Sequence, residues 1–514
     1  MLKLVLGISG SGKTTRLYDA LRTRALAGQK SILLVPEQFT SSTEARIYQT
    51  LGDENSGMVE SFSFTSLAER ILERCGGAAV QTLTDAGRVV LVRRALEALE
   101  GNVKYYYRHR RSAAFCQLAA ETIDELKSAG LSGRQLGELA GRCGPGSEKL
   151  AELALIFETY EALLTQTGMD PSDRLAVAAE RLDGALAAGQ VPEFLAGRAV
   201  FIDEFDTFNA PKKRLMAALL RTLPEVTVAL CADDAHWTPG ELGLFSGAKK
   251  VALDLQRLAR ENGVAVAAPT VLRQDLRHRN APGLAALGRL LAEDDCAEQT
   301  AAEITLYAAP SREEEARAAA AAVYRLARGG AKYRSMAVVC RDTELYRAAV
   351  RYEFRLAGIP LYCDEPLNPA FSAPAAAVKA LLALCRGVDW CDNMTNLAKS
   401  GLCELTEAQV CALENYVYTW SPPAAAWREP FERSPQGFGE TSRLTEEDRA
   451  SVRLAESARA FLIGPVDKLR RAARSAPAAQ LSRALYLCLR ELGAEQCQQR
   501  QVERLRHSRG IPAA

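Results

Sequence analysis

The N-terminal segment constrains the fold more than any other part of the chain. An apolar run at residues 2–8 leads into the loop Gly7-Ile8-Ser9-Gly10-Ser11-Gly12-Lys13-Thr14, and helical periodicity follows over residues 14–26. This order of strand, loop and helix is the context in which the pattern G-x-x-x-x-G-K-[ST] binds phosphate. The sequence therefore predicts an α/β fold with a phosphate-binding P-loop.

The residue types of this loop fit a nucleoside triphosphate. Glycines let the backbone wrap around a phosphate, so that successive N–H groups and the helix N-terminus face the anion. Lys13 is expected to reach the β- and γ-phosphates of ATP, and Thr14 to ligate Mg²⁺. The alternative is an ordinary glycine-rich turn. ATP and Mg²⁺ are therefore the predicted cofactors, and residues 7–14 the predicted nucleotide site.

A pair of carboxylates follows the predicted strand at residues 199–202. Asp203 and Glu204 come directly after the apolar residues of that strand, which is the form of a Walker B element beside a P-loop. We expect Asp203 to hold Mg²⁺, and Glu204 to orient or deprotonate the attacking water. The alternative is a pair of exposed acids at the end of a strand, which is a common arrangement.

Two arginines are candidates for contact with the γ-phosphate. Arg277 ends the basic and polar segment 272–277, at the junction of two predicted α/β units, and Arg341 follows the predicted strand at residues 336–340. A cation there stabilises the charge that develops during phosphoryl transfer and couples the nucleotide state to domain closure. The alternative for each is a solvated surface arginine.

A basic and aromatic run occupies residues 104–111, with the sequence Lys-Tyr-Tyr-Tyr-Arg-His-Arg-Arg. Cations can follow a phosphate backbone, and aromatic rings can stack on bases. Because three consecutive tyrosines on a helix point in three directions, at least one is expected to pack inward. The run is equally compatible with contact to DNA and with a solvated helix face.

Composition excludes several classes of protein. The 13 cysteines include no CxxC pair, and only four histidines are present, so neither a disulfide framework nor a zinc ribbon is indicated. The net charge of +1 means that a DNA-binding surface has to be a local groove. No apolar run approaches the ~18 residues needed to span a bilayer. We therefore expect a cytoplasmic protein without membrane contact.

The 514 residues are enough for about three or four domains. Predicted strands alternate with helices, which indicates a parallel sheet, and they lie at residues 31–35, 58–64, 199–202 and 226–231. Residues 84–182 have almost wholly helical periodicity. A second α/β unit is predicted from strands at 304–307, 336–340 and 361–363 and helices at 312–328 and 343–357. The chain is predicted to be helical after residue 373, with breaks near 421–423 and 434–437.

Taken in order, these motifs resemble those of superfamily 1 helicases and, among them, the AddB family. The resemblance covers nearly the whole chain and rests on the P-loop, Val35-Pro36-Glu37-Gln38, residues 61–68, Asp203-Glu204-Phe205, residues 274–277, Tyr105-Tyr106-Tyr107-Arg108 and Gly358-Ile359-Pro360. It implies tandem RecA-type lobes with helical insertions. The implied segments are 1–83 (domain 1A, first part), 84–183 (insertion 1B), 184–270 (rest of 1A), 271–385 (domain 2A, first part) and 386–514 (insertion 2B, incomplete).

The resemblance implies a subunit of an ATP-dependent helicase/exonuclease that processes DNA double-strand breaks for recombinational repair. The implied partners are an AddA-like helicase/nuclease subunit, in a heterodimer, and single- and double-stranded DNA, including the Chi sequence. Members of the family also carry a nuclease domain and an iron-sulfur cluster on four cysteines, none of which can be placed here. The chain is therefore expected to lack the cluster and nuclease activity of its own.

Two departures from the helicase pattern bear on translocation along DNA. No glutamine motif precedes Gly7, and residues 228–234 lack the glutamine of motif III, so the resemblance assigns the motor to the partner subunit. Two rival functions stay open, a P-loop kinase or other small-molecule NTPase, and a non-catalytic scaffold with a helicase fold. Residues 507–514 have neither periodicity nor a cap, which indicates a chain that is truncated there.

Overall fold

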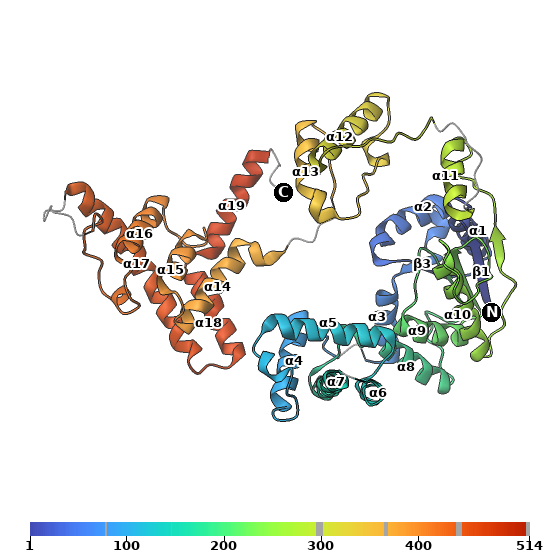
Figure 1. The fold of residues 1–514 in the computed structure, drawn as a ribbon, viewed down its shortest axis with the longest axis horizontal. Helices are drawn as coiled ribbons and strands as arrows, with labels where there is room; N and C mark the ends of the chain where they lie inside the picture. Colours follow the sequence, from blue (N-terminus) through green and yellow to red (C-terminus); the bar gives the residue numbers. More distant parts are fainter. Residues whose placement is uncertain (78–79, 145, 294–301, 364–367, 438–444, 510–514) are drawn as a thin grey trace. The chain divides into compact units, whose positions relative to one another are not determined.

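The computed structural model describes residues 1–77, 80–144, 146–293, 302–363, 368–437 and 445–509. The chain forms two compact units, Met1–Tyr307 and Ala308–Ala514. Unit 1 contains a β-sheet flanked by helices, whereas the described part of unit 2 is helical (Figure 1). The two units are described separately below.

The sheet of unit 1 has six strands in the order β3-β2-β4-β5-β1-β6, and every neighbouring pair is parallel. The bounds are β1 Leu2–Gly7, β2 Ser31–Leu34, β3 Val59–Phe62, β4 Ala199–Ile202, β5 Glu225–Cys231 and β6 Thr270–Leu272. The five strands predicted in this part of the chain, and their parallel arrangement, are confirmed to within two residues at each end. β6 was not predicted.

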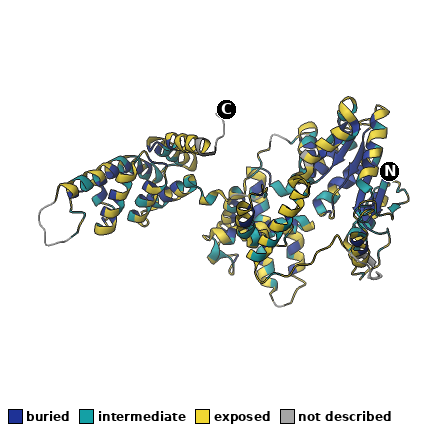
Figure 2. Cartoon of the chain, turned by 90° about the horizontal axis from the view of Figure 1, so that it is seen from above, coloured by how far each residue is buried: buried dark blue, intermediate teal, exposed yellow. Residues whose placement is uncertain are grey.

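Helices cover both faces of the sheet because side chains alternate along each strand. Leu33 and Phe201 face α1 (Lys13–Leu26) and α2 (Thr40–Ser56), and a glycine at position 52 interrupts α2. Ile32 and Val200 face α3 (Phe64–Cys75), α8 (Arg174–Ala187), α9 (Ala210–Thr222) and α10 (Ser246–Glu261). Figure 2 shows these strands coloured as buried. The last helix of the unit is α11 (Pro282–Glu293).

A helical insertion separates β3 from β4, as the helical periodicity of residues 84–182 predicted. It contains α4 (Asp85–Ala98), α5 (Ala113–Ala129), α6 (Gly133–Ala140) and α7 (Ser147–Thr167). Its core is separate from the two cores of the sheet and packs α4, α5 and α7 around the fully buried rings of Phe157 and Tyr160. The insertion can therefore hold its shape without the sheet.

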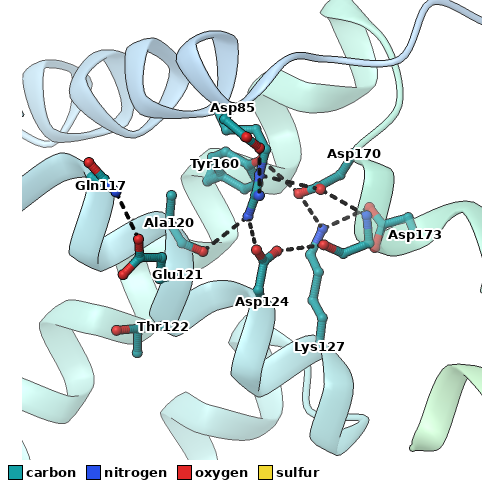
Figure 3. A network of polar contacts seen from close by, with 12 residues as sticks. Asp85, Gln117, Ala120, Glu121, Thr122, Asp124, Lys127, Tyr160, Asp170 and Asp173 are labelled. Carbon is teal, nitrogen blue, oxygen red and sulfur yellow. Dashed lines mark hydrogen bonds and ion pairs between the residues drawn. The ribbon is translucent and has the colours of Figure 1, made fainter. Parts of the chain in front are cut away.

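A buried polar network joins three helices of the insertion to the segment that leads back to the sheet (Figure 3). Its centre is Asp170, whose side chain is fully buried. The Tyr160 hydroxyl donates to Asp170 Oδ2 at 2.7 Å, and Lys127 Nζ lies 3.3 Å from the same oxygen. Arg88 of α4 lies 3.5 Å from Asp170 Oδ1 and also pairs with Asp124 of α5.

The charges of this network offset the cost of burying them. Burial alone would raise the pKa of Asp170, but Lys127, hydrogen bonds from Tyr160 and Ser172, and Arg88 outweigh it, so the pKa lies below its ordinary value. Burial also raises the pKa of the Tyr160 hydroxyl, and the hydrogen bond to Asp170 raises it further. Asp170 is therefore ionised and Tyr160 neutral at physiological pH.

Unit 2 begins with α12 (Arg312–Arg328) and α13 (Thr343–Leu356), both predicted from the sequence. A helical bundle follows, made of α14 (Ala373–Arg386), α15 (Trp390–Lys399), α16 (Glu407–Trp420), α17 (Glu446–Ala473), α18 (Ala478–Glu491) and α19 (Ala494–Arg509). The bundle core includes the fully buried ring of Trp427. The predicted breaks near 421–423 and 434–437 lie outside helices. No helix among the described residues of either unit is long and apolar enough to cross a membrane.

The strands predicted at residues 304–307, 336–340 and 361–363 are wrong. These segments carry apolar side chains in extended stretches, but the described residues around them contain no strand. A strand exists only where a neighbouring strand accepts and donates its backbone hydrogen bonds. The side chains of Leu306, Val339 and Tyr362 are 97%, 91% and 87% exposed, so nothing in this unit covers them. The second α/β lobe therefore stays a prediction.

Candidate functional site

The predicted P-loop joins β1 to α1. β1 ends at Gly7, and α1 begins at Lys13, one residue before the predicted start. Gly10 and Gly12 have φ angles of 82° and 88°, a left-handed conformation that glycine adopts far more readily than other residues. No side chain caps α1, so its first-turn N–H groups are available to a ligand, and they favour an anion.

The segment with Asp275, Leu276 and Arg277 packs directly on this loop. The Leu276 N–H donates to the Gly10 carbonyl at 3.0 Å, and Arg277 Nη1 donates to the Ser9 hydroxyl at 3.2 Å. A Cβ atom at Gly10 would lie 2.8 Å from the Arg277 Cβ and 2.9 Å from a carboxylate oxygen of Asp275. Position 10 therefore requires glycine both for its backbone angle and for this close approach.

Lys13 and Ser11 have polar groups directed into the loop. Lys13 Nζ donates to the carbonyl oxygens of Gly7 and Ile8 at 2.7 and 2.8 Å. Partial burial lowers the pKa of the Lys13 ammonium, although Cys231, Asp203 and Glu204 act in the opposite direction. The Ser11 hydroxyl is buried and has no hydrogen-bond partner among the described residues. Both groups can therefore gain a hydrogen bond from a ligand's oxygen atoms.

Asp203 and Glu204 lie where β4 ends. Asp203 is 5% exposed, accepts a hydrogen bond from the Thr14 hydroxyl, and accepts a second from the Glu204 N–H at 3.0 Å. Glu204 has a φ angle of 66° and is one of three non-glycine residues with a positive φ in the described part of the chain. Such a conformation costs about 1–3 kcal/mol and is concentrated at functional sites. The turn aims the two carboxylates at the P-loop.

Burial and mutual repulsion act on the two carboxyl groups. Burial raises the pKa of Asp203, and the hydrogen bonds from Thr14 and Glu204 and the charges of Lys13 and Arg46 oppose the rise without cancelling it. Burial and the charge of Asp203 raise the pKa of Glu204, and Lys13 and Arg46 again oppose the rise. Both acids would therefore be stabilised in the ionised form by a bound cation.

One cavity of about 480 Å³ collects most of the predicted site residues. It is lined by Ser9, Gly10, Gly12, Lys13, Thr14, Asp203, Glu204 and Arg277. Gly7, Ile8 and Ser11 lie behind it and shape the loop. Hydroxyl and carboxylate oxygens from Thr14 and Asp203, which suit Mg²⁺, meet the N–H groups and ammonium that suit phosphates. The residues present therefore fit a magnesium-bound nucleoside triphosphate.

Arg341 is the predicted site residue that this cavity does not contain. It belongs to unit 2, where it follows an extended segment and is exposed. Its predicted contact with a phosphate therefore stays a prediction. Arg277, in contrast, lines the cavity from the segment that follows β6.

Arg46 is a site residue that the sequence did not reveal. It comes from α2, its guanidinium lies 4.9 Å from the centre of the Tyr18 ring, and it lines the cavity together with the two acids. An arginine in the middle of a helix matches no short motif, and α2 itself was not predicted. The only signal was a helical spacing after β2 that brings residues 43 and 46 towards α1.

The rings of the basic and aromatic run at residues 104–111 make contacts within the insertion. The Tyr106 ring stacks on Phe115 with centres 5.5 Å apart, and Arg110 lies 4.0 Å above the Tyr107 ring. The Tyr105 hydroxyl donates to Glu148 at 2.9 Å. The expected inward packing of at least one tyrosine is confirmed for Tyr106, whereas DNA contact stays a prediction.

Comparison with known proteins gives one family match and a consistent set of relatives. The family described as ADDB, N-terminal, matches residues 4–288, which is more than half of the chain. The matched span includes the P-loop, both carboxylates and Arg277.

The relatives are all named as a subunit of an ATP-dependent helicase/deoxyribonuclease. The protein from Moorella thermoacetica is 31% identical over 96% of this chain and 44% of its own length. Those from Geobacillus thermodenitrificans and Clostridium perfringens are 29% and 25% identical, over 96% and 91% of this chain and 44% and 41% of theirs. The chain thus spans less than half the length of these relatives.

Proposed function

The chain belongs to the AddB family, and on that premise we propose that it binds ATP and Mg²⁺ at the P-loop and couples this to DNA handling. The observation that carries the proposal is the single cavity in which Lys13, Thr14, Asp203 and Glu204 meet. The relatives' name supports the proposal further, because it describes part of an ATP-dependent helicase and deoxyribonuclease.

Each residue of the cavity has a role in nucleotide binding. The N–H groups at the start of α1 and the Lys13 ammonium bind the phosphates. Thr14 and Asp203 hold Mg²⁺, which neutralises phosphate charge when bound. Arg277 lies on the loop through Ser9 and is placed to contact the γ-phosphate.

Glu204 acts on the attacking water. Its ionised carboxylate orients the water and accepts its proton, which requires that the group be deprotonated before the reaction. Arg46 and Lys13 favour that ionised form. Arg46 therefore supports turnover from α2, a helix outside the P-loop.

The wider role is processing of DNA breaks within a larger assembly. The partner we propose is an AddA-like helicase/nuclease subunit, and the substrates are single- and double-stranded DNA. Recognition of the Chi sequence and the division into domains 1A, 1B, 2A and 2B stay predictions that rest on the family resemblance alone.

The test is ATP hydrolysis measured with and without single-stranded DNA. The intact chain is compared with Glu204→Gln and with a matched control, Glu261→Gln, at the end of α10. We expect DNA to stimulate turnover, Glu204→Gln to reduce it by about a hundredfold or more, and the control to match the wild type.

Two results would redirect the proposal. Nucleotide binding without turnover, with DNA and an AddA-like subunit present, would favour a non-catalytic scaffold. Phosphoryl transfer to a nucleoside or metabolite, without any effect of DNA, would favour a small-molecule kinase.

A further inference from the structure

A second hollow lies at the edge of the sheet opposite the P-loop. Its volume is about 850 Å³. Its walls come from the last turns of α1 and α3 and from the residues that immediately precede β2 and β4. Because all six strands are parallel, these positions gather at the amino-terminal edge, whereas the P-loop follows the carboxyl end of β1. The two cavities are therefore separate sites of unit 1.

The lining of this hollow is strongly basic. Five cations line it against two carboxylates, Glu60 and Glu193; the cations are Arg24, Lys30, Arg70, Arg74 and Arg198. Four of the five are arginines, whose planar guanidinium groups present several N–H donors to an anion. A hollow concentrates the field of such a cluster and attracts anions more strongly than a flat surface does.

Two of the cations are held in place by the fold. Arg198 is 8% exposed and donates from Nη1 to a carboxylate oxygen of Glu60 at 2.6 Å. Arg24 donates from Nε to the Ser31 hydroxyl at 3.1 Å. The conformational entropy of these two side chains is therefore already reduced before a ligand binds.

Lys30 and Arg74 complete the rim and are exposed. Neither forms an ion pair with any residue that the structure describes, whereas Arg70 pairs with Glu73 at 3.1 Å. An incoming anion can therefore be neutralised by Lys30 and Arg74 without first breaking an internal ion pair.

The lining discriminates between two kinds of macromolecular partner. Protein interfaces have an apolar centre and contain few lysines and glutamates, whereas protein–DNA interfaces are polar and positively charged. The one aromatic residue of the hollow, Phe194, is buried, so no exposed ring is available to stack on bases.

We propose that this hollow binds the phosphodiester backbone of nucleic acid, without reading its sequence, through Arg24, Lys30 and Arg74. This inference rests on the proposed role in DNA handling and adds a contact surface to it. The surface lies at the edge of the sheet opposite the ATP site, so DNA held there does not compete with the nucleotide.

The experiment compares duplex DNA binding by the intact chain and by the double variant Lys30→Glu, Arg74→Glu over a range of salt concentrations. The matched control is Lys250→Glu, Arg257→Glu, which makes the same charge change at exposed positions of α10. We expect the hollow variant to bind at least about tenfold more weakly at low salt, with a salt slope smaller by about 0.9 for each phosphate that is no longer neutralised. The control keeps the wild-type slope.

Binding of a fluorescent ATP analogue, measured on the same samples, checks the fold, and Lys30→Gln, Arg74→Gln replaces any variant that loses it. A wild-type slope in the hollow variant, or an equal loss in the control, would overturn this inference and leave the proposed function standing. If the intact chain binds no DNA at any ionic strength, both fail. Loss of poly-glutamate binding alone in the hollow variant would reassign the hollow to an acidic protein partner and overturn the inference.

Discussion

At the scale of single residues, Glu204 combines a left-handed backbone with a raised pKa beside a second carboxylate. Since a general base acts in its ionised form, we expect turnover to fall as the pH is lowered through this raised pKa. The acid limb of the kcat profile then lies above the ordinary pKa of a glutamate. Turnover that is unchanged down to the ordinary pKa range of glutamate would contradict this role.

Arg46 provides a second residue-scale prediction, because its charge lowers the pKa of both acids. Arg46→Ala removes that charge, so the pKa of Glu204 rises further and the acid limb of the kcat profile moves to higher pH. Arg22→Ala, an exposed change on α1, is the control and leaves the limb where it is. An unmoved limb in Arg46→Ala would show that Arg46 does not act on Glu204.

Gly10 tests the contact between the P-loop and residues 275–277. Gly10→Ala and Gly263→Ala both place a side chain at a positive φ, 82° and 69°, which costs about 1–2 kcal/mol. A Cβ at Gly263 meets nothing within 4 Å, whereas one at Gly10 displaces Arg277. Calorimetry is therefore expected to show similar destabilisation of both, but weaker ATP binding for Gly10→Ala alone. Equal ATP affinities would exclude a role for this contact.

At the scale of elements, the buried network around Asp170 fixes the helices of the insertion to one another. Asp170→Asn removes the shared partner of Lys127 and Arg88, and breaking such a buried pair costs about 3 kcal/mol. Asp85, whose side chain is 97% exposed and 3.7 Å from Arg88, is the control, and Asp85→Asn should change the free energy of unfolding by less than about 0.5 kcal/mol. Denaturant unfolding of both variants measures the difference.

The same network predicts the sign of a pH effect. The pKa of Asp170 is lower in the folded chain than in the unfolded chain, so its contribution is present above the unfolded pKa and is lost as the pH falls through the folded pKa. The stability difference between wild type and Asp170→Asn should therefore shrink on acidification. A difference that is independent of pH would mean that the charge of Asp170 contributes nothing.

The sequence predicted the elements of the first sheet because their periodicity was complete within the local chain. Val200, Phe201 and Ile202 read as a buried strand, and the parallel neighbours they require are supplied by β2 and β5. β6 was missed because its three residues are too few for a pattern. The strands predicted at 304–307, 336–340 and 361–363 had the right composition, but strand formation depends on partners that composition cannot reveal.

The site was predicted where function follows a contiguous motif and missed where it follows tertiary packing. Lys13, Asp203 and Glu204 belong to short motifs at strand ends, and the structure brings them to one cavity. Arg46 reaches that cavity only because α2 packs against α1, and the packing of Arg277 on Ser9 joins residues 268 positions apart. Contacts of this kind are set by the fold and leave no local pattern.

At the scale of the whole molecule, unit 1 has its own sheet, core and candidate nucleotide site. Of the predicted nucleotide contacts, Arg341 alone lies in unit 2. Residues 1–307 produced as a separate chain are therefore expected to fold and to bind ATP within about threefold of the intact chain. The same fragment with Lys13→Ala is the control. Loss of ATP binding in a folded fragment would assign an essential contact, such as Arg341, to unit 2.

The central claim is that ATP and Mg²⁺ bind in the cavity between the P-loop and β4, and calorimetric titration of ATP tests it most directly. With Mg²⁺ present, the account predicts that Lys13→Ala binds ATP at least about tenfold more weakly than the wild type, because a charged hydrogen bond to phosphate is removed. Lys250→Ala is predicted to bind normally, and chelation of Mg²⁺ to weaken binding by the wild type. Equal affinities of Lys13→Ala and the wild type would contradict the account.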